Sequence, residues 1–347
     1  MRIAIDVMSG DNAPLELIKG ATAAAKSTDA EIILCGDEGI INYVAFQNDI
    51  DLSSVKIKHA SEVIVMEDAP LSVMKDKADS SMSVGLRMLS AGEADAFISA
   101  GNTGALVAGA TLIVRRIKGI KRAAIGTVLP FDPPLLLLDS GANVEVSSKD
   151  LVQFGIMGSV YYEKLFEAGE CRVGLLNNGT EYNKGTPTVK EAYGLLSECG
   201  SVNFVGNIEA KTLPFDCCDV LVTDGFSGNI VLKMAEGMGS FMVKILKDMF
   251  KTNAVTMLSA MTMKKQLKDI KKTFNASEYG GAPILGISKP VIKAHGSSDA
   301  YAIENAVKQA ISYVGTGVIR DIARKIKKEN DNTETAVIKD TENKESE

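Results

Sequence analysis

The sequence predicts an α/β fold in which helices cover both faces of a mostly parallel, Rossmann-like sheet, giving three layers. Short β-branched or apolar segments alternate with amphipathic segments along most of the 347 residues. Alternation at this spacing is typical of βαβ units, whose helical crossovers join parallel strands. We therefore expect one large α/β domain over residues 1–328.

The expected strands are short runs rich in valine, isoleucine and leucine. They are Arg2–Val7, Glu31–Cys35, Val55–Lys58, Ala96–Ala100, Ala123–Val128, Leu135–Asp139, Arg172–Asn177, Val202–Val205, Val220–Thr223 and Val291–His295. The expected helices have apolar residues at helical spacing. They are Pro14–Ser27, Asp79–Ala91, Asn102–Ile117, Ser148–Phe166, Thr188–Glu198, Asn229–Phe250 and Asp299–Ile311.

The composition is that of a soluble globular protein, with 46% hydrophobic and 24% charged residues. The net charge of −6 argues against nucleic-acid binding, which needs a basic surface. No segment reaches the ~18 apolar residues of a membrane span, and the first residues resemble a strand rather than a signal peptide. Five cysteines without a CxxC pair, and two histidines, argue against a metal site. We expect a cytoplasmic protein with reduced thiols.

Ligands of such folds bind where strands end, so the strand-to-helix junctions are the first places to search. The junction Lys293–Asp299 contains a lysine, His295, a glycine and two serines directly before an expected helix. A helix N-terminus offers unpaired N–H groups to an anion, and histidine can transfer a proton near neutral pH. An ordinary helix cap after a strand would have the same sequence.

Four other junctions combine glycine with asparagine, serine or threonine. They are Gly101–Gly104, Asp139–Asn143, Asp224–Asn229 and the loop Asn177–Gly185, which adds Lys184. Each alone also fits a capped turn, but together, at one edge of the sheet, they predict a site for a small anion beside a carbonyl substrate. The chain has no Walker A or G-x-G-x-x-G pattern. The Asp224–Asn229 turn fails as a hydrolase nucleophile elbow because Asn229 replaces the last glycine.

Two segments depart from the α/β pattern. Residues 241–275 carry eight lysines and two aspartates, and we expect a protruding helical hairpin with an apolar tip. The tip could contact anionic lipid or pack against a partner subunit. Residues 329–347 carry seven acidic residues and two lysines, and we expect a disordered acidic tail.

Seven motifs occur in the order of one protein family. They are Asp6–Pro14, Ser99–Ala105, Leu138–Asn143, Gly206–Glu209, Asp224–Asn229, Tyr279–Pro283 and Lys293–Ser298. Over residues 2–315 the chain resembles the bacterial phosphate acyltransferases of phospholipid synthesis. It departs from the family pattern at Ser9 and Asn12, and in the lysine loop at Asn178, Thr180, Tyr182 and Asn183.

The resemblance implies a fold similar to phosphotransacetylases and the isocitrate dehydrogenase class, a homodimer and no cofactor. It also implies transfer of a fatty acyl group from the thioester of acyl carrier protein to inorganic phosphate. A membrane glycerol-3-phosphate acyltransferase would consume the acyl phosphate, so the enzyme would associate peripherally with the inner face of the cell membrane. In that setting the tip residues Val255, Met257, Leu258 and Met261 are the expected membrane contacts.

With this reaction in view, each candidate residue can be given an expected role. Phosphate would bind at the helix starts and beside a lysine, namely at Asn102, Thr103, Gly104, Lys293, Ser297 and Ser298. His295 would protonate the leaving thiolate and Asn229 would stabilise the tetrahedral oxyanion. Lys184 and Asp224 complete the candidate catalytic set. His59 lies in an ordinary short strand and is expected to be structural.

Three alternatives remain open at this point. The acyl donor could be a coenzyme A thioester, as in phosphotransacetylases. The chain could instead be a non-catalytic scaffold that holds acyl carrier protein at the membrane through the basic arms of residues 241–275. A covalent acyl-cysteine intermediate is disfavoured because none of the five cysteines lies in a glycine-rich junction.

Overall fold

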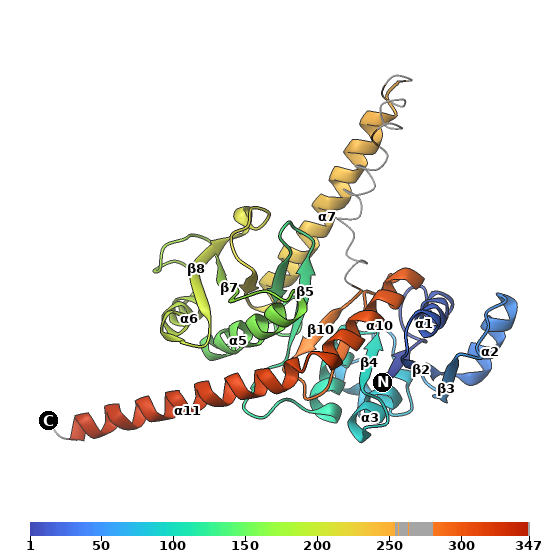
Figure 1. The fold of residues 1–347 in the computed structure, drawn as a ribbon, viewed down its shortest axis with the longest axis horizontal. Helices are drawn as coiled ribbons and strands as arrows, with labels where there is room; N and C mark the ends of the chain where they lie inside the picture. Colours follow the sequence, from blue (N-terminus) through green and yellow to red (C-terminus); the bar gives the residue numbers. More distant parts are fainter. Residues whose placement is uncertain (254–255, 257–262, 264–279, 346–347) are drawn as a thin grey trace.

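A computed structural model describes residues 1–253, 256, 263 and 280–345, and its centre is an eleven-stranded sheet (Figure 1). The strands lie in the order β3-β2-β1-β4-β11-β10-β5-β6-β9-β7-β8. Their bounds are β1 Arg2–Asp6, β2 Glu31–Gly36, β3 Val55–His59, β4 Ala96–Ser99, β5 Ala124–Leu129, β6 Leu135–Leu138, β7 Arg172–Asn177, β8 Asn203–Glu209, β9 Val220–Val222, β10 Ala282–Leu285 and β11 Val291–Lys293. All ten strands expected from the sequence are present, and β10 is additional.

The sheet changes direction at its centre. Strands β3, β2, β1, β4 and β11 run parallel to one another, and so do β6, β9, β7 and β8. Between these halves, β10 pairs antiparallel with β11 and β5, and β5 pairs antiparallel with β6. The two parallel halves therefore point in opposite directions, and their strands end at opposite edges of the sheet.

Helices cover both faces, as the predicted three layers require. One face packs against α1 (Leu15–Ser27), α2 (Glu38–Gln47), α5 (Ser148–Leu165), α6 (Pro187–Glu198), α10 (Ala300–Gly315) and α11 (Val318–Glu345). The other packs against α3 (Ser81–Ala91), α4 (Thr103–Gly109) with its π-helical continuation Ala110–Val114, and α7 (Gly225–Phe250). The short helices Pro70–Val73 and Ala210–Thr212 complete the described elements.

Most expected helices are confirmed, with differences at their ends. The helix expected to start at Asn229 starts at Gly225, because Asp224 caps it by accepting the N–H of Ser227 at 2.7 Å. The helix expected over Asn102–Ile117 changes to π-helical geometry at Ala110 and stops at Arg115. Helix α2, which the sequence analysis missed, begins at the capping residue Asp37.

Two helices extend away from the body (Figure 1). Helix α7 rises from the middle of the molecule and includes residues 241–250, the first part of the segment expected to form a hairpin. Most of the remaining segment, with Val255, Met257, Leu258 and Met261, lies outside the described residues. Helix α11 continues to Glu345, and the sequence analysis did not predict this helix. Residues 318–345 contain no glycine or proline, and nothing in their sequence ends a helix.

Candidate active site

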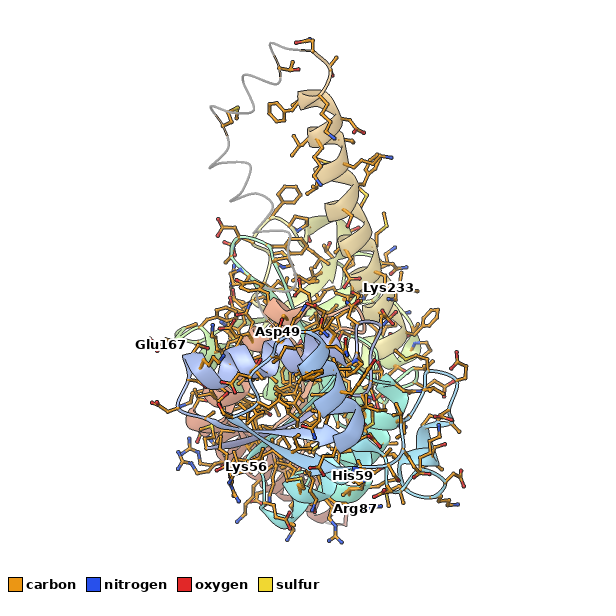
Figure 2. All side chains as sticks on the ribbon, turned by 90° about the vertical axis from the view of Figure 1, so that its right-hand side faces the viewer. Asp49, Lys56, His59, Arg87, Glu167 and Lys233 are labelled. Carbon is orange, nitrogen blue, oxygen red and sulfur yellow. The ribbon has the colours of Figure 1, made fainter. Side chains whose placement is uncertain are left out.

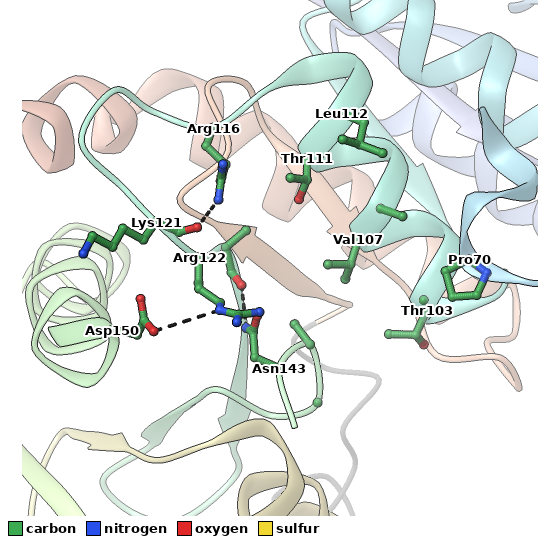
Figure 3. A pocket seen from close by; sticks show the side chains of 15 residues that line it. Pro70, Thr103, Val107, Thr111, Leu112, Arg116, Lys121, Arg122, Asn143 and Asp150 are labelled. Atoms are coloured by element: carbon green, nitrogen blue, oxygen red, sulfur yellow. Dashed lines mark hydrogen bonds and ion pairs between the residues drawn. The ribbon is translucent and has the colours of Figure 1, made fainter. Parts of the chain in front are cut away.

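A cavity of about 760 Å³ runs along α4 (Figure 3). Pro70, Thr103, Val107 and Leu112 form one side. The opposite side is formed by Arg116, Lys121–Ala123, the turn Gly141–Asn143 and Asp150. The cavity is therefore apolar along the helix, polar at the Gly141–Asn143 turn and basic near Arg116, which suits a substrate with a long, partly apolar chain.

The ends of β1, β4 and β11 meet beside the N-terminus of α4. A Cβ atom on Gly10, which has a φ of +123°, would lie 3.1 Å from the carbonyl oxygen of Gly296. A Cβ atom on Gly101 would lie 2.8 Å from the Cβ of Ser9. The N–H of Asp11 donates to the same Gly296 oxygen at 2.8 Å. Glycine is needed at these positions because the three turns approach one another too closely for side chains.

His295 is exposed and has a fixed orientation in this group of turns. Its Nδ1 accepts the backbone N–H of Ser297 at 3.2 Å and lies 2.9 Å from the Ser297 hydroxyl oxygen. Because a backbone N–H can only donate, Nδ1 carries no proton in the neutral ring. The proton of the neutral imidazole is therefore on Nε2.

Ser298 contributes an unused hydroxyl to the same loop. Its side chain is 4% exposed, and within the described part of the chain its Oγ has no hydrogen-bond partner. The backbone beside it is fixed, because Asn12 donates its amide to the carbonyl oxygens of Ser297 and Ser298 at 3.0 and 3.3 Å. Buried polar groups are nearly always paired, so an unpaired hydroxyl held this firmly is suited to a ligand.

Lys293 brings a positive charge to the face of the sheet that carries α4. Side chains alternate along a strand, so Lys293 shares the face of Val291, which packs in the apolar cluster of α4. Its Nζ donates to the carbonyl oxygen of Ala294 at 2.6 Å. Burial and the nearby charge of Lys233 lower the pKa of Lys293 to about 8, while Asp11 acts in the opposite direction.

Lys233 shows how α7 approaches these turns from the other half of the sheet. It lies on α7 near the point where the helix leaves the body (Figure 2), and its charge acts on Lys293. Helix α7 follows β9 and so begins at the opposite sheet edge. It shares a sheet face with α4, so the two helices flank the centre of the sheet.

Asn102 is placed at the expected anion site, but its side chain is already used. The Oδ1 atom caps α4 by accepting the N–H of Ala105 at 3.0 Å. The Nδ2 atom donates to the carbonyl oxygens of Val65, Met66 and Asp68 at 3.3, 2.9 and 3.1 Å. Asn102 therefore holds the 65–68 loop beside the site. Thr103 and Gly104, which line the cavity, are left as the residues of this junction that could bind a ligand.

Asp139 organises a second group of turns, at the end of β6. This fully buried carboxylate accepts the N–H groups of Ile125, Gly141, Ala142 and Asn143 at 2.7–3.1 Å, and the side-chain amide of Asn143 at 2.8 Å. Burial raises the pKa of Asp139, and these donors oppose that increase. The carboxylate fixes the Gly141–Asn143 turn that forms a wall of the cavity.

Asn229 and Asp224 lie in this second group. Asn229 donates its amide to the carbonyl oxygen of Ser140 at 3.2 Å and packs against Gly141. Asp224 accepts both the N–H and the hydroxyl of Ser227. Its carboxylate is thus an N-cap, a structural role that the catalytic expectation for Asp224 did not include.

The prediction that all these junctions meet at one sheet edge is wrong. Lys184 lies in the loop after β7, which is five strands from β11 and in the half of the sheet with the opposite direction. The strand reversal at β10 and β5 therefore separates Lys184 from the His295 turn. The structure brings together Thr103, Gly104, Lys293, His295, Ser297 and Ser298.

The second histidine of the chain, His59, is remote from this site (Figure 2). Its Nδ1 accepts the N–H of Glu38 at 3.2 Å at the start of α2, in agreement with the structural role expected for it. Lys233 and the basic residues beside the cavity were not predicted, because only folding brings them near the strand ends.

Comparison with known proteins identifies the family. A model described as fatty acid synthesis protein matches residues 1–321. A phosphate acyltransferase of Thermoanaerobacter pseudethanolicus is 46% identical over 328 residues, covering 94% of this chain and 97% of the relative. One of Alkaliphilus oremlandii is 45% identical over 324 residues, covering 93% and 96%. The chain belongs to the phosphate acyltransferase family. It is therefore an acyltransferase, as the resemblance to this family implied.

Solved structures confirm the fold expected for a phosphate acyltransferase. A phosphotransacetylase from Streptococcus pyogenes superposes with a TM-score of 0.61 at 17% identity, covering 94% of each chain. A branched-chain phosphotransacylase from Enterococcus faecalis gives a TM-score of 0.56 at 14% identity, covering 91% of this chain and 99% of that one. At these identities the likeness shows the shared architecture alone.

Proposed function

We propose that this enzyme transfers a fatty acyl group from the thioester of acyl carrier protein to inorganic phosphate. The observation that carries the proposal is the cluster of Lys293, His295 and the unpaired hydroxyl of Ser298 beside the N-terminus of α4. A cation, unpaired donors and a helix start are suited to phosphate. The apolar side of the cavity along α4 is suited to a thioester with a long chain.

In the proposed reaction the bound phosphate is the nucleophile. A phosphate oxygen attacks the thioester carbonyl carbon, and the tetrahedral intermediate collapses as the C–S bond breaks. Lys293 and the N–H groups at the start of α4 hold the phosphate within reach of the carbonyl. His295 enters this step as the imidazolium, with Nδ1–H donated to the Ser297 hydroxyl oxygen 2.9 Å away. Its Nε2–H then delivers a proton to the departing thiolate and leaves a neutral ring. The products are acyl phosphate and the free thiol, and no covalent enzyme intermediate is required.

The role of Asn229 follows from its position at the Gly141 wall. One amide hydrogen is donated to Ser140, and an amide NH₂ group has a second hydrogen to donate. Asn229 belongs to the half of the sheet that also carries Lys184, so we assign this hydrogen to the part of the thioester that lies against the Gly141 wall, and backbone N–H groups near the phosphate to the oxyanion. Lys184 is left as a candidate for binding a more distant part of the substrate, because of its position in the other half of the sheet.

Comparing thioester donors tests the choice of acyl carrier protein. Acyl phosphate formation is measured with radiolabelled phosphate, using the same acyl group on carrier protein and on coenzyme A. A kcat/KM at least tenfold higher for the carrier-protein donor supports the proposal. A higher kcat/KM for coenzyme A would favour the phosphotransacetylase-like alternative, and no acyl phosphate from either donor would favour a scaffold.

The apolar side of α7 supports a homodimer. Large apolar side chains that are 44–61% exposed follow one another at intervals of three or four residues along this helix. They are Phe226, Ile230, Met234, Met238, Phe241, Ile245 and Met249. Such spacing places them on one face, and a long exposed apolar face marks an interaction surface. We assign this face to a second copy of the chain.

We also propose a peripheral location at the inner face of the cytoplasmic membrane. The acyl phosphate product has an apolar tail, and its consumer would be a glycerol-3-phosphate acyltransferase in the bilayer. The net positive charge of residues 241–275 is suited to anionic lipid. In the described part of the chain, no helix combines the length and hydropathy needed to cross a bilayer. Glutamate at Leu258 and Met261 should therefore release the protein from anionic liposomes.

A further inference from the structure

The segment Arg115–Arg122 is a concentrated basic surface on an acidic protein. It contains five cations, Arg115, Arg116, Lys118, Lys121 and Arg122, and no acidic residue, whereas the whole chain has a net charge of −6. All five are exposed. We call these eight residues the basic loop. A patch of one charge at the surface attracts a partner of the opposite charge.

The backbone of the basic loop is held firmly by the core. Gln153 is 9% exposed and uses both ends of its amide on the loop. Its Nε2 donates to the carbonyl oxygen of Gly119 at 2.8 Å, and its Oε1 accepts the N–H of Lys121 at 3.0 Å. Ile117 and Ile120 are buried at 6% and 5% exposure. The buried isoleucines and the amide fix the loop while its cationic side chains extend into solvent.

The basic loop also forms one end of the cavity, whose other end is lined by Thr103 and Gly104 at the start of α4. Arg116, Lys121 and Arg122 belong to the cavity wall (Figure 3). Arg122 lies 4.0 Å from the carboxylate of Asp150, and Arg116 donates to the carbonyl oxygen of Lys121. From Val114, the last helical residue, the wall follows the helix back to Thr103, eleven positions earlier, which corresponds to about 16 Å. A long thioester arm that enters at the loop could therefore reach the start of α4.

We propose that the basic loop is the docking surface for an acidic acyl carrier protein, whose thioester arm extends along α4 to the phosphate site. The inference rests on the proposed function and adds where the donor protein binds. The occupant is an acidic protein because five exposed cations beside the cavity match a broad acidic surface. A small thioester enters the same cavity without covering the whole loop.

Charge reversal at two exposed cations tests the docking surface. We choose Arg115→Glu combined with Lys118→Glu, because both are exposed and neither is among the residues that line the cavity. KM for acyl carrier protein should rise about tenfold or more, with kcat little changed, since surface charges act mainly on association. Added salt should raise the wild-type KM and have much less effect on the variant.

Two comparisons make the result specific. The same kinetics are measured with acyl-pantetheine, a small uncharged thioester, and KM for this donor should not change. Lys26→Glu combined with Lys190→Glu changes the net charge equally at exposed sites on other elements, and it should leave KM for the carrier protein within about twofold. An unchanged carrier-protein KM in the loop variant overturns the proposal, and so does an equal rise in KM for acyl-pantetheine. Absence of acyl phosphate from wild-type enzyme with every donor would instead reject the proposed function.

Discussion

The backbone N–H of Ser297 donates to Nδ1 of His295 at 3.2 Å, and the Ser297 hydroxyl oxygen lies 2.9 Å from the same nitrogen. This contact assigns the proton of the neutral ring to Nε2. In the imidazolium form the Ser297 hydroxyl can accept Nδ1–H instead, and Nε2–H is left for the leaving thiolate.

Replacing His295 with glutamine should lower kcat about a hundredfold, because the leaving thiolate loses its proton donor. KM for phosphate should change less than threefold if His295 acts as an acid and not as a phosphate ligand. Steady-state kinetics at saturating phosphate measure both values, with circular dichroism as the control for folding. A fully folded variant with wild-type kcat would exclude the acid role.

Ser298→Ala should weaken phosphate binding without weakening the fold. The hydroxyl is buried and unpaired, so its loss removes a donor to phosphate worth about 1 kcal/mol, or roughly a fivefold rise in KM. The melting temperature of the free enzyme should stay the same or rise. Ser159→Ala is the matched control, because the buried Ser159 hydroxyl donates to the Ile156 carbonyl at 3.0 Å. The control should lower the melting temperature and leave KM for phosphate unchanged. A lower melting temperature for Ser298→Ala with an unchanged KM for phosphate would contradict the assignment of this hydroxyl to phosphate.

The lowered pKa of Lys293 predicts a pH dependence. Its cation is lost as the pH rises through about 8, so KM for phosphate should increase above that pH. In the unfolded chain Lys293 keeps its proton to higher pH, so its contribution to the stability of the free enzyme rises across the same interval. Lys293→Met should show a high KM for phosphate at every pH, without the inflection near pH 8. An inflection that persists in Lys293→Met would assign the titration to another group.

The apolar face of α7 predicts the oligomeric state. Met234→Glu combined with Met238→Glu places two charges on residues that are 61% and 45% exposed, and it should convert a dimer into monomers. Light scattering after size-exclusion chromatography measures the mass. Lys247 is exposed on the same helix and lies away from the apolar face at about 100° per residue, and the Lys247→Glu variant should remain dimeric. A wild-type monomer, or a double variant that stays dimeric, would reject this interface.

The local pattern of the sequence was sufficient to predict the strands, most helices and the three layers. It was not sufficient to predict the course of the sheet, because β10 has only four residues and includes Pro283. That short strand, together with β5, reverses the second half of the sheet. The reversal explains why Lys184 does not join His295, although both follow predicted strands. The direction of each strand depends on which distant segment it pairs with, and a single sequence does not show that pairing.

The sequence was also only partly sufficient to predict the candidate site. It placed Asn102, Asp224 and Ser298 correctly at strand-to-helix junctions, but it did not show which groups their polar atoms bond to. Asn102 and Asp224 turn out to cap helices, while the Ser298 hydroxyl is buried without a partner. The residues that cap and those that could bind a ligand have similar sequence signatures, and only the hydrogen bonds separate them.

Phosphate-dependent release of thiol tests the central claim most directly. Wild-type enzyme is incubated with acyl carrier protein thioester, with and without inorganic phosphate, and free thiol and acyl phosphate are both quantified. We predict one acyl phosphate for each thiol released, saturation with phosphate, and a rate about a hundredfold lower in the His295→Gln variant. Thiol release at the same rate without phosphate, or thiol release with no acyl phosphate, would contradict the proposed reaction.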